Sequence, residues 1–174
     1  MPRATLASVL VLLLVAAGLM SCSSGTPRAA GCGPVERQQA QFPANHVLPG
    51  QPEPTYLSDP PTSGPHAALA RVDPVYEAPL PRPTQVGILE TGKVLAQYRP
   101  DLPADQVARL KQLAGGQLVV APNPGLDKGV VTTAWLYAQR CASFDEATVK
   151  AFVDKHGAQG PGGHPASSTS SSNP

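Results

Sequence analysis

The chain of 174 residues is predicted to form one α+β domain. We expect a small, mostly antiparallel sheet with two helices packed on one side, preceded by a proline-rich extended arm. Three observations predict this class: eleven prolines within residues 43–83, short strand-like apolar runs within 84–136, and apolar residues at helical spacing in two later stretches. Strands and helices mixed in this order favour an α+β fold.

The N-terminus is typical of an exported bacterial protein. Arg3 precedes an apolar run that ends at Gly18, and Leu19-Met20-Ser21-Cys22 follows. This order predicts a signal peptide over residues 1–21. The motif resembles a lipobox, in which the cysteine becomes the diacylated first residue, although Met20 replaces the usual small side chain. We expect a lipid anchor at Cys22 on the extracytoplasmic face of the cell membrane, with an uncleaved membrane anchor as the alternative.

Composition divides the remaining chain into three parts. Residues 22–41 are small and polar and are expected to be a tether, 42–156 the single domain, and 157–174, rich in Gly and Ser, a disordered tail. The chain carries 13 basic and 12 acidic residues, so removing Arg3 with the signal leaves 12 of each. A neutral protein without a basic run is not expected to bind nucleic acid.

Two cysteines remain after Cys22, and both are expected in an oxidising compartment. Cys32 and Cys141 therefore predict a disulfide that pins the start of the mature chain to its last third. Because it closes so long a loop, this disulfide would stabilise the folded state by roughly 4–5 kcal/mol at most. Two free thiols in a metal or redox site are the alternative, without the Cys-x-x-Cys spacing that would favour it.

The arm and the elements after it follow in chain order. Apolar side chains between Val47 and Tyr76 favour an arm that packs on the core over a disordered one. Next come two strands joined by a hairpin, a helix that begins at Pro103 and stops at two glycines, and two further strands. The expected strands are 86–89, 94–98, 117–121 and 129–136, and the hairpin turn is Thr91-Gly92.

The last helix has the clearest signals. Ser143 and Glu146 have the spacing of a capping box, while the alternative register places Asp145 at the cap with Phe144 packed as a hydrophobic staple. Gly157 is expected to end this helix.

Several short motifs resemble one exported bacterial family. They are His46-Val47 followed by Pro49-Gly50, Pro60-Pro61-Thr62-Ser63-Gly64-Pro65-His66, Leu89-Glu90-Thr91-Gly92, Tyr98-Arg99-Pro100-Asp101, Val120-Ala121-Pro122, Thr133-Ala134-Trp135 and Phe144-Asp145-Glu146. In this order, over roughly residues 32–156, they resemble the uncharacterised family called domain of unknown function 3105. The resemblance implies a fold and a location and no chemistry.

The chain departs from that family at two positions. Relatives tend to carry His-x-Leu-Glu-His-Gly, where this chain has Gly87 and Thr91 in place of the two histidines. Glu90 and His66 remain at matching positions. Any chemistry that depends on the missing histidines in relatives is expected to be lost or altered here.

A metal site is the strongest chemical hypothesis. His46, His66 and Glu90 offer imidazole and carboxylate groups, which suit zinc or copper. The two histidines could instead be turn residues that bind backbone groups. Glu90 either points inward, paired with Arg99 or a histidine, or lies in water at the hairpin rim.

Other candidates point to binding rather than catalysis. Ser63 lies outside any nucleophile elbow, and no phosphate loop or haem motif is present, so we expect no enzyme. Trp135 and its neighbour Tyr137 either form a ligand platform or pack in the core. The imidazole of His156 is expected to interact favourably with the helix dipole at the end of the last helix.

The hypothesis favoured by the sequence is a lipid-anchored, non-catalytic binding or structural module of the cell envelope. Its partners would be the membrane and an envelope protein, and it would need no cofactor. The alternative is a metal-binding domain with a residual or altered site around His66 and Glu90. Convergence of His46 with these two residues would favour this alternative.

Overall fold

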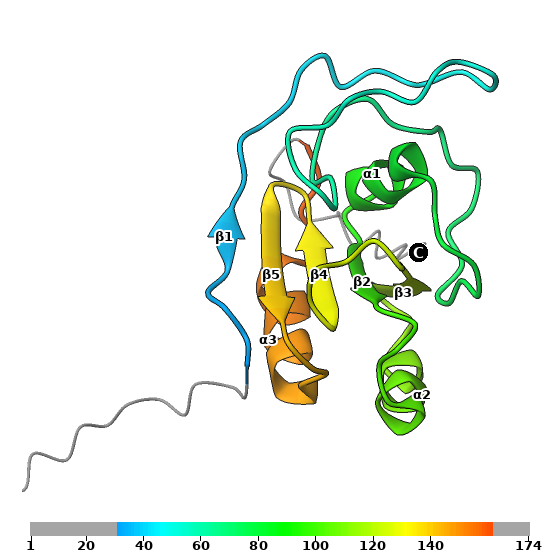
Figure 1. Cartoon of the computed structure of the whole chain (residues 1–174). Coiled ribbons are helices and arrows are strands. Elements are labelled where there is room, and N and C mark those ends of the chain that lie inside the picture. Colours follow the sequence, from blue (N-terminus) through cyan, green and yellow to red (C-terminus); the bar gives the residue numbers. More distant parts are fainter. Residues whose placement is uncertain (1–30, 162–174) are drawn as a thin grey trace, which may run out of the picture.

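The computed structural model describes residues 31–161, which form a five-stranded sheet and three helices (Figure 1). The expected signal peptide, Cys22 and most of the expected tail lie outside these residues. None of the helices in the described part of the chain combines the length and apolarity needed to cross a membrane. The elements are β1 (Glu36–Arg37), α1 (Arg82–Glu90), β2 (Val94–Tyr98), α2 (Ala104–Gln112), β3 (Leu118–Pro122), β4 (Val130–Ala134), β5 (Tyr137–Cys141) and α3 (Glu146–His156).

The sheet has the strand order β1-β5-β4-β2-β3. Only β2 and β3 are parallel, and α2 lies between them in the chain, as a parallel connection requires. All other neighbouring strands are antiparallel. The predicted α+β class with a mostly antiparallel sheet is therefore confirmed.

The sheet buries an apolar cluster on each face because successive side chains of β2 alternate. Val94 packs with Leu110 of α2 and Phe152 of α3 in one cluster. Leu95, the next residue, packs with Val86 of α1 in the other. Two helices share one face, as expected, and a third helix covers the other face, which the sequence analysis missed.

That third helix replaces the predicted strand over residues 86–89. Pro83 lies in its first turn, where the missing N–H costs nothing, and Gly92, with φ +81°, ends it by donating its N–H to the Leu89 carbonyl. The prediction was wrong because a four-residue apolar run fits a strand and a buried helix equally well. The hairpin at Thr91-Gly92 is consequently a helix end.

A second hairpin lies where one strand was expected. β4 ends at Ala134, Trp135 and Leu136 form the turn, and the chain returns as β5. Leu136 adopts φ +65°, a conformation in which glycine or asparagine is usual, so the sequence carried no turn signal. Trp135 therefore lies in the turn, and Tyr137 is the first residue of β5.

Residues 43–81 form no helix, and their only β pairing is through isolated bridges. Part of this segment lies against the face of the sheet that α1 covers. Their partly buried apolar side chains pack on the cluster that contains Val86; these are Tyr56, Leu69, Val72, Tyr76 and Leu80. Leu48 and Leu57, by contrast, are exposed.

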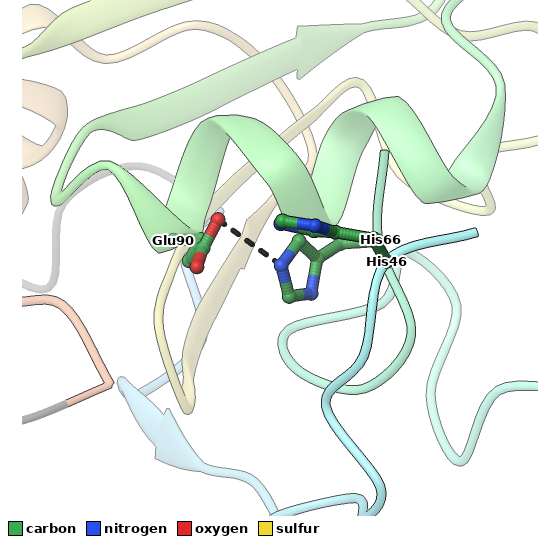
Figure 2. A group of neighbouring side chains, drawn as sticks. All are labelled: His46, His66 and Glu90. Carbon is green, nitrogen blue, oxygen red and sulfur yellow. Dashed lines mark ion pairs between the residues drawn. The ribbon is translucent and has the colours of Figure 1, made fainter. Parts of the chain in front are cut away.

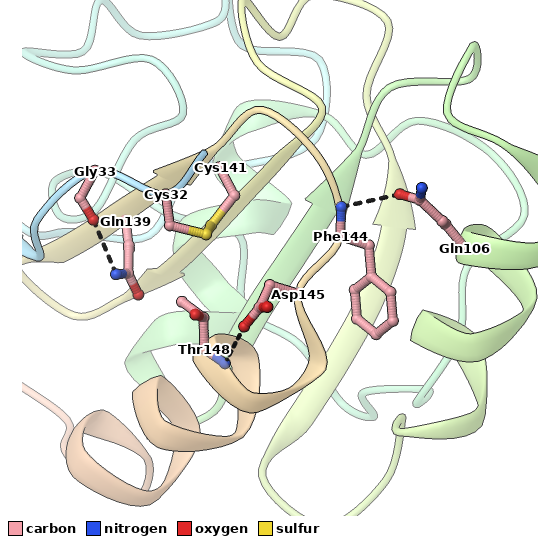
Figure 3. The surroundings of a disulfide bond; sticks show 8 residues. All are labelled: Cys32, Gly33, Gln106, Gln139, Cys141, Phe144, Asp145 and Thr148. Carbon is pink, nitrogen blue, oxygen red and sulfur yellow. Dashed lines mark hydrogen bonds between the residues drawn. A yellow bond between two sulfur atoms is a disulfide. The ribbon is translucent and has the colours of Figure 1, made fainter. Parts of the chain in front are cut away.

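The predicted disulfide joins Cys32 to Cys141, the last residue of β5 (Figure 3). Nearby, Gln139 Nε2 donates to the Gly33 carbonyl at 3.0 Å, and β1 pairs with β5. Residues 31–37 are thus attached to the sheet, earlier than the expected start of the domain at residue 42.

Helix α3 begins in the alternative of its two expected registers. The Asp145 carboxylate accepts the Thr148 N–H at 2.7 Å, which makes Asp145 the N-cap in place of Ser143 (Figure 3). Phe144 precedes the cap and shares a buried cluster with Val149, as a hydrophobic staple requires. Gly157 ends the helix, as expected.

Candidate metal site

His66 lies in the loop before α1, and its ring orientation is set by the backbone. The side chain is 3% exposed, and Nδ1 lies 3.0 Å from the Gly64 carbonyl oxygen. Because a carbonyl oxygen only accepts, Nδ1 carries the proton and donates it. Nε2 therefore points away from the loop with its lone pair available.

Glu90 is the last residue of α1, and its carboxylate faces that lone pair. Oε2 lies 3.1 Å from His66 Nε2, and the Glu90 side chain is 36% exposed (Figure 2). The pair is not aligned as a hydrogen bond, so the buried Nε2 has no hydrogen-bond partner among the described residues. A divalent cation between Nε2 and the carboxylate would be bound by the lone pairs of both atoms.

His46 joins the pair from the proline-rich segment. The His66 N–H donates to the Asn45 carbonyl at 3.0 Å, and the Val47 N–H donates to the His66 carbonyl at 2.8 Å. These two bonds hold the histidines side by side, with ring centroids 5.0 Å apart and planes at 89°. The ligand atoms of the exposed His46, His66 and Glu90 lie within 4.8 Å of one another (Figure 2).

These separations are close to those of a metal site. Two atoms that each bind an ion at about 2.1 Å are at most about 4.2 Å apart, and about 3.4 Å apart in a tetrahedral site. The 3.1 Å between His66 and Glu90 fits this geometry. The wider separations involve His46, whose exposed side chain can rotate to close the remaining gap.

A glycine allows α1 to lie this close to the histidine loop. A Cβ at position 87 would lie 2.5 Å from the Ala67 carbonyl oxygen, and the Ala67 N–H donates to the Pro83 carbonyl at 2.9 Å. Gly87 thus lets the helix pack against the chain just after His66, which brings Glu90 over the imidazole. A larger side chain at position 87 would require this contact to open.

The remaining sequence candidates lie apart from this cluster. Arg99 Nε and Nη2 bind the two oxygens of Asp101 at 2.8 and 2.6 Å, so Arg99 is not the partner of Glu90. This hydrogen bonding lowers the pKa of Asp101 and raises that of Arg99. Ser63 Oγ accepts the Gln41 N–H at 3.0 Å and is buried.

Trp135 packs in the core. It is 9% exposed and shares the buried cluster that contains Val86 and Leu95, so the ring fills space between the sheet and α1. The alternative of a ligand platform is not supported by this burial.

His156 has a role that the sequence analysis missed. It is 4% exposed, and its ring centroid lies 4.2 Å from that of Tyr137 and 4.8 Å from that of Phe152. Neither ring nitrogen has a hydrogen-bond partner in the described part of the chain. Burial, and then the charge of Lys155, lower the pKa of His156. The dipole at the end of α3 does not outweigh this loss of hydration. The sequence did carry a signal for this burial: His156 lies four residues after Phe152 and therefore on the same apolar face of α3.

Fold and site together define a disulfide-bonded α+β domain with a candidate metal site at one helix end. Residues 47–171 match the profile of the family described as a protein of unknown function, DUF3105. Because the match covers most of the chain, the protein belongs to this family, as the resemblance implied. No curated protein and no solved structure matches the chain.

Proposed function

We propose that this domain binds a divalent transition metal, Zn²⁺ or Cu²⁺, through His46, His66 and Glu90. The observation that carries the proposal is the buried Nε2 of His66, which has no hydrogen-bond partner within residues 31–161 and faces a carboxylate oxygen at 3.1 Å. Metal-binding histidines commonly donate their other N–H to a backbone carbonyl, as His66 does to Gly64.

The donor set selects the class of metal. Two imidazoles and one carboxylate suit Zn²⁺ and Cu²⁺, while Ca²⁺ and Mg²⁺ prefer oxygen ligands alone. Among equal sites Cu²⁺ binds more tightly than Zn²⁺, so metal supply decides which ion is bound in the cell. Three protein ligands leave at least one coordination position open, on the side where His46 is exposed.

We propose that the site is presented outside the cytoplasmic membrane. The apolar N-terminal run and the lipobox-like motif at Cys22 support export and acylation, and the Cys32–Cys141 disulfide is compatible with an oxidising compartment. A lipid anchor would keep the metal site at the membrane surface.

The second candidate is a binding module for an envelope protein. The exposed large apolar side chains favour it, because three of the four among the described residues lie between positions 42 and 57: Phe42 is 81% exposed, and Leu48 and Leu57 are each 62% exposed. Neighbouring exposed apolar groups commonly mark contact surfaces. This candidate needs no metal.

A calorimetric titration separates the two candidates. The full-length, disulfide-bonded protein in detergent is stripped of metal with a chelator and titrated with Zn²⁺ and Cu²⁺. We expect one equivalent to bind, and Glu90→Gln and His46→Ala each to weaken binding at least tenfold, about 1.4 kcal/mol. Both changes leave the buried imidazole in place.

The matched control is Glu77→Gln, which removes an exposed carboxylate that pairs with Lys111 outside the site. It should bind metal as the wild type does. Absence of stoichiometric binding, or equal binding by Glu90→Gln, would reject the metal proposal and leave the binding module.

A further inference from the structure

The chain after α3 returns to the end of α1 that carries Glu90. The Ala158 N–H donates to the Gly92 carbonyl at 2.7 Å. Gly160 lies against Glu90 itself, because a Cβ at position 160 would be 3.0 Å from the Glu90 carbonyl oxygen. Residues 158–160, which we term the clasp, belong to the expected tail and are half-buried in the structure.

The clasp joins two helices that cover opposite faces of the sheet. Phe152 of α3 packs in one buried cluster, while Leu89 of α1 packs in the other. The Gln159 side chain donates to the Lys155 carbonyl in the last turn of α3 at 2.8 Å, so the clasp is held at α3 as well as at α1. The clasp therefore fixes the end of α1 relative to a helix on the other side of the sheet.

The backbone of the clasp is held in an unfavourable conformation by its contact with α1. Ala158 adopts φ +60°, in the left-handed region that a residue with a Cβ rarely occupies. Such a conformation persists only where the surrounding structure imposes it. Here the Gly92 carbonyl accepts the Ala158 N–H, and a Cβ at position 92 would lie only 3.3 Å from the Ala158 carbonyl carbon.

Glu90 lies in the part of α1 that most needs such support. Carbonyl groups in the last turn of a helix lack partners within the helix, so helix ends fray. Glu90 is the last residue of this nine-residue helix, and its carboxylate must stay beside His66 Nε2 if the two are to share an ion. Contact of the clasp with the backbone of residues 90–92 opposes fraying at this end.

We propose that the clasp positions Glu90 as a metal ligand, and that a bound metal in turn strengthens the clasp. The inference rests on the proposed metal-binding function and extends it. The clasp contacts the α1 backbone and supplies no ligand of its own, so it acts through Glu90. By linkage, the factor by which closure of the clasp raises the metal affinity equals the factor by which the metal favours closure.

Calorimetric titration of the full-length, disulfide-bonded protein with Zn²⁺ tests the positioning role. Ala158→Pro removes the N–H donor and cannot adopt a positive φ, so it should weaken Zn²⁺ binding about fivefold or more. In a Glu90→Gln background the same change should weaken binding less than about twofold, because the ligand that the clasp positions is gone. Ala158→Gly keeps the N–H and suits the positive φ, so this conservative variant should bind Zn²⁺ as the wild type does.

Hydrogen exchange of the unmodified protein tests the reciprocal effect. Saturating Zn²⁺ should slow exchange of the Ala158 N–H about fivefold or more, the same factor as in the titration. The control is the Leu113 N–H, which donates to the Leu110 carbonyl at the end of α2, on the other face of the sheet. Its exchange should not change with Zn²⁺.

The outcomes separate the inference from the function on which it rests. Equal Zn²⁺ affinity of the wild type and Ala158→Pro, or equal losses with and without the Glu90 carboxylate, would overturn the positioning role and leave the three-residue site intact. An Ala158 N–H whose exchange Zn²⁺ does not slow would overturn it too. This second measurement decides alone if Ala158→Pro does not fold or if the double variant binds too weakly to titrate. Failure of the wild type to bind Zn²⁺ would reject both the inference and the proposed function.

Discussion

Two buried histidines of this domain have opposite surroundings. One ring nitrogen of His66 lies beside a backbone carbonyl and the other beside a carboxylate. His156 packs against Tyr137 and Phe152, and none of the described residues forms a hydrogen bond with its ring. The first environment offers two ligand atoms to a metal ion beside the ring. The second favours the neutral imidazole, because no group replaces the water that a charged ring would lose.

The environment of His156 predicts a dependence of stability on pH. A histidine in the unfolded chain has a pKa of about 6.5, and burial lowers the pKa of His156 below this value in the fold. Below about pH 6.5 the unfolded state therefore binds a proton that the folded state does not, and the free energy of unfolding falls until the folded pKa is reached. The decline should be smaller in His156→Phe, which keeps an aromatic ring of similar size.

Thermal melts of both proteins at pH 7.5 and pH 5.5, without metal, check this prediction. The wild type should lose more of its melting temperature on acidification than His156→Phe. Equal losses would show that the pH dependence originates elsewhere.

At the scale of elements, α1 is the part of the fold that builds the site. Its N-terminal turn is bonded to the residue after His66, its glycine permits close contact with that segment, and its last residue supplies the carboxylate. The helix has only nine residues and would be marginal alone. Burial of Val86, Ile88 and Leu89 against the sheet stabilises it and so fixes the position of Glu90.

At the start of helix α3, mutation can test whether Asp145 or Ser143 is the N-cap. Asp145 accepts the Thr148 N–H, and hydrogen bonds from the Thr148 side chain and backbone lower the pKa of the Asp145 carboxyl. Asp145→Ala should reduce the free energy of unfolding by about 1 kcal/mol, within the range of about 0.5–2 for lost N-caps. Ser143→Ala, the matched control, should change it by less than about 0.5 kcal/mol.

Urea denaturation at pH 7 measures both variants. Because the Asp145 pKa is lowered in the fold, its contribution is present above the unfolded value near 3.9 and is lost as the pH falls through the folded pKa. The difference between wild type and Asp145→Ala should therefore shrink in strong acid. A larger effect of Ser143→Ala at pH 7 would contradict the assigned register.

At the scale of the whole molecule, segments far apart in the chain are held together at two places. The disulfide joins Cys32 to Cys141 over a separation of 109 residues. At the site, two distant parts of the proline-rich segment before α1 supply His46 and His66, and the end of α1 supplies the carboxylate. A bound metal would cross-link these segments without a covalent bond and so stabilise the folded chain by mass action.

The proposed membrane attachment belongs to this scale and is tested on cells that produce the protein. Cys22→Ala should move the protein from the membrane fraction to the soluble fraction, because a lone acyl-bearing cysteine supplies the anchoring methylenes. Ser24→Ala, a neighbouring change that keeps the cysteine, is the control. Retention of Cys22→Ala in the membrane fraction would contradict lipid anchoring and favour an uncleaved anchor.

Local sequence patterns were sufficient to predict several features of the fold. Two cysteines in a chain expected to be exported predicted the disulfide. The run from Ser143 to Glu146 predicted α3 with two alternative registers, one of which the structure has. β2, β3, β4 and α2 were also predicted from short apolar patterns and their flanking glycines and prolines. Most of these signals depend only on neighbouring residues. The disulfide prediction depends on the tendency of paired cysteines to become oxidised outside the cytoplasm.

Only the tertiary structure decided the rest. The apolar run at 86–89 fits a strand or a helix, and packing against the sheet selected the helix. The turn at Leu136 depends on a conformation that leucine rarely adopts, so contacts and not propensity impose it. His46, His66 and Glu90 were named from residue type alone, and their approach depends on the glycine contact and the backbone pairing of two loops. Sequence determines which chemical groups are present, while the distances between them arise from long-range packing.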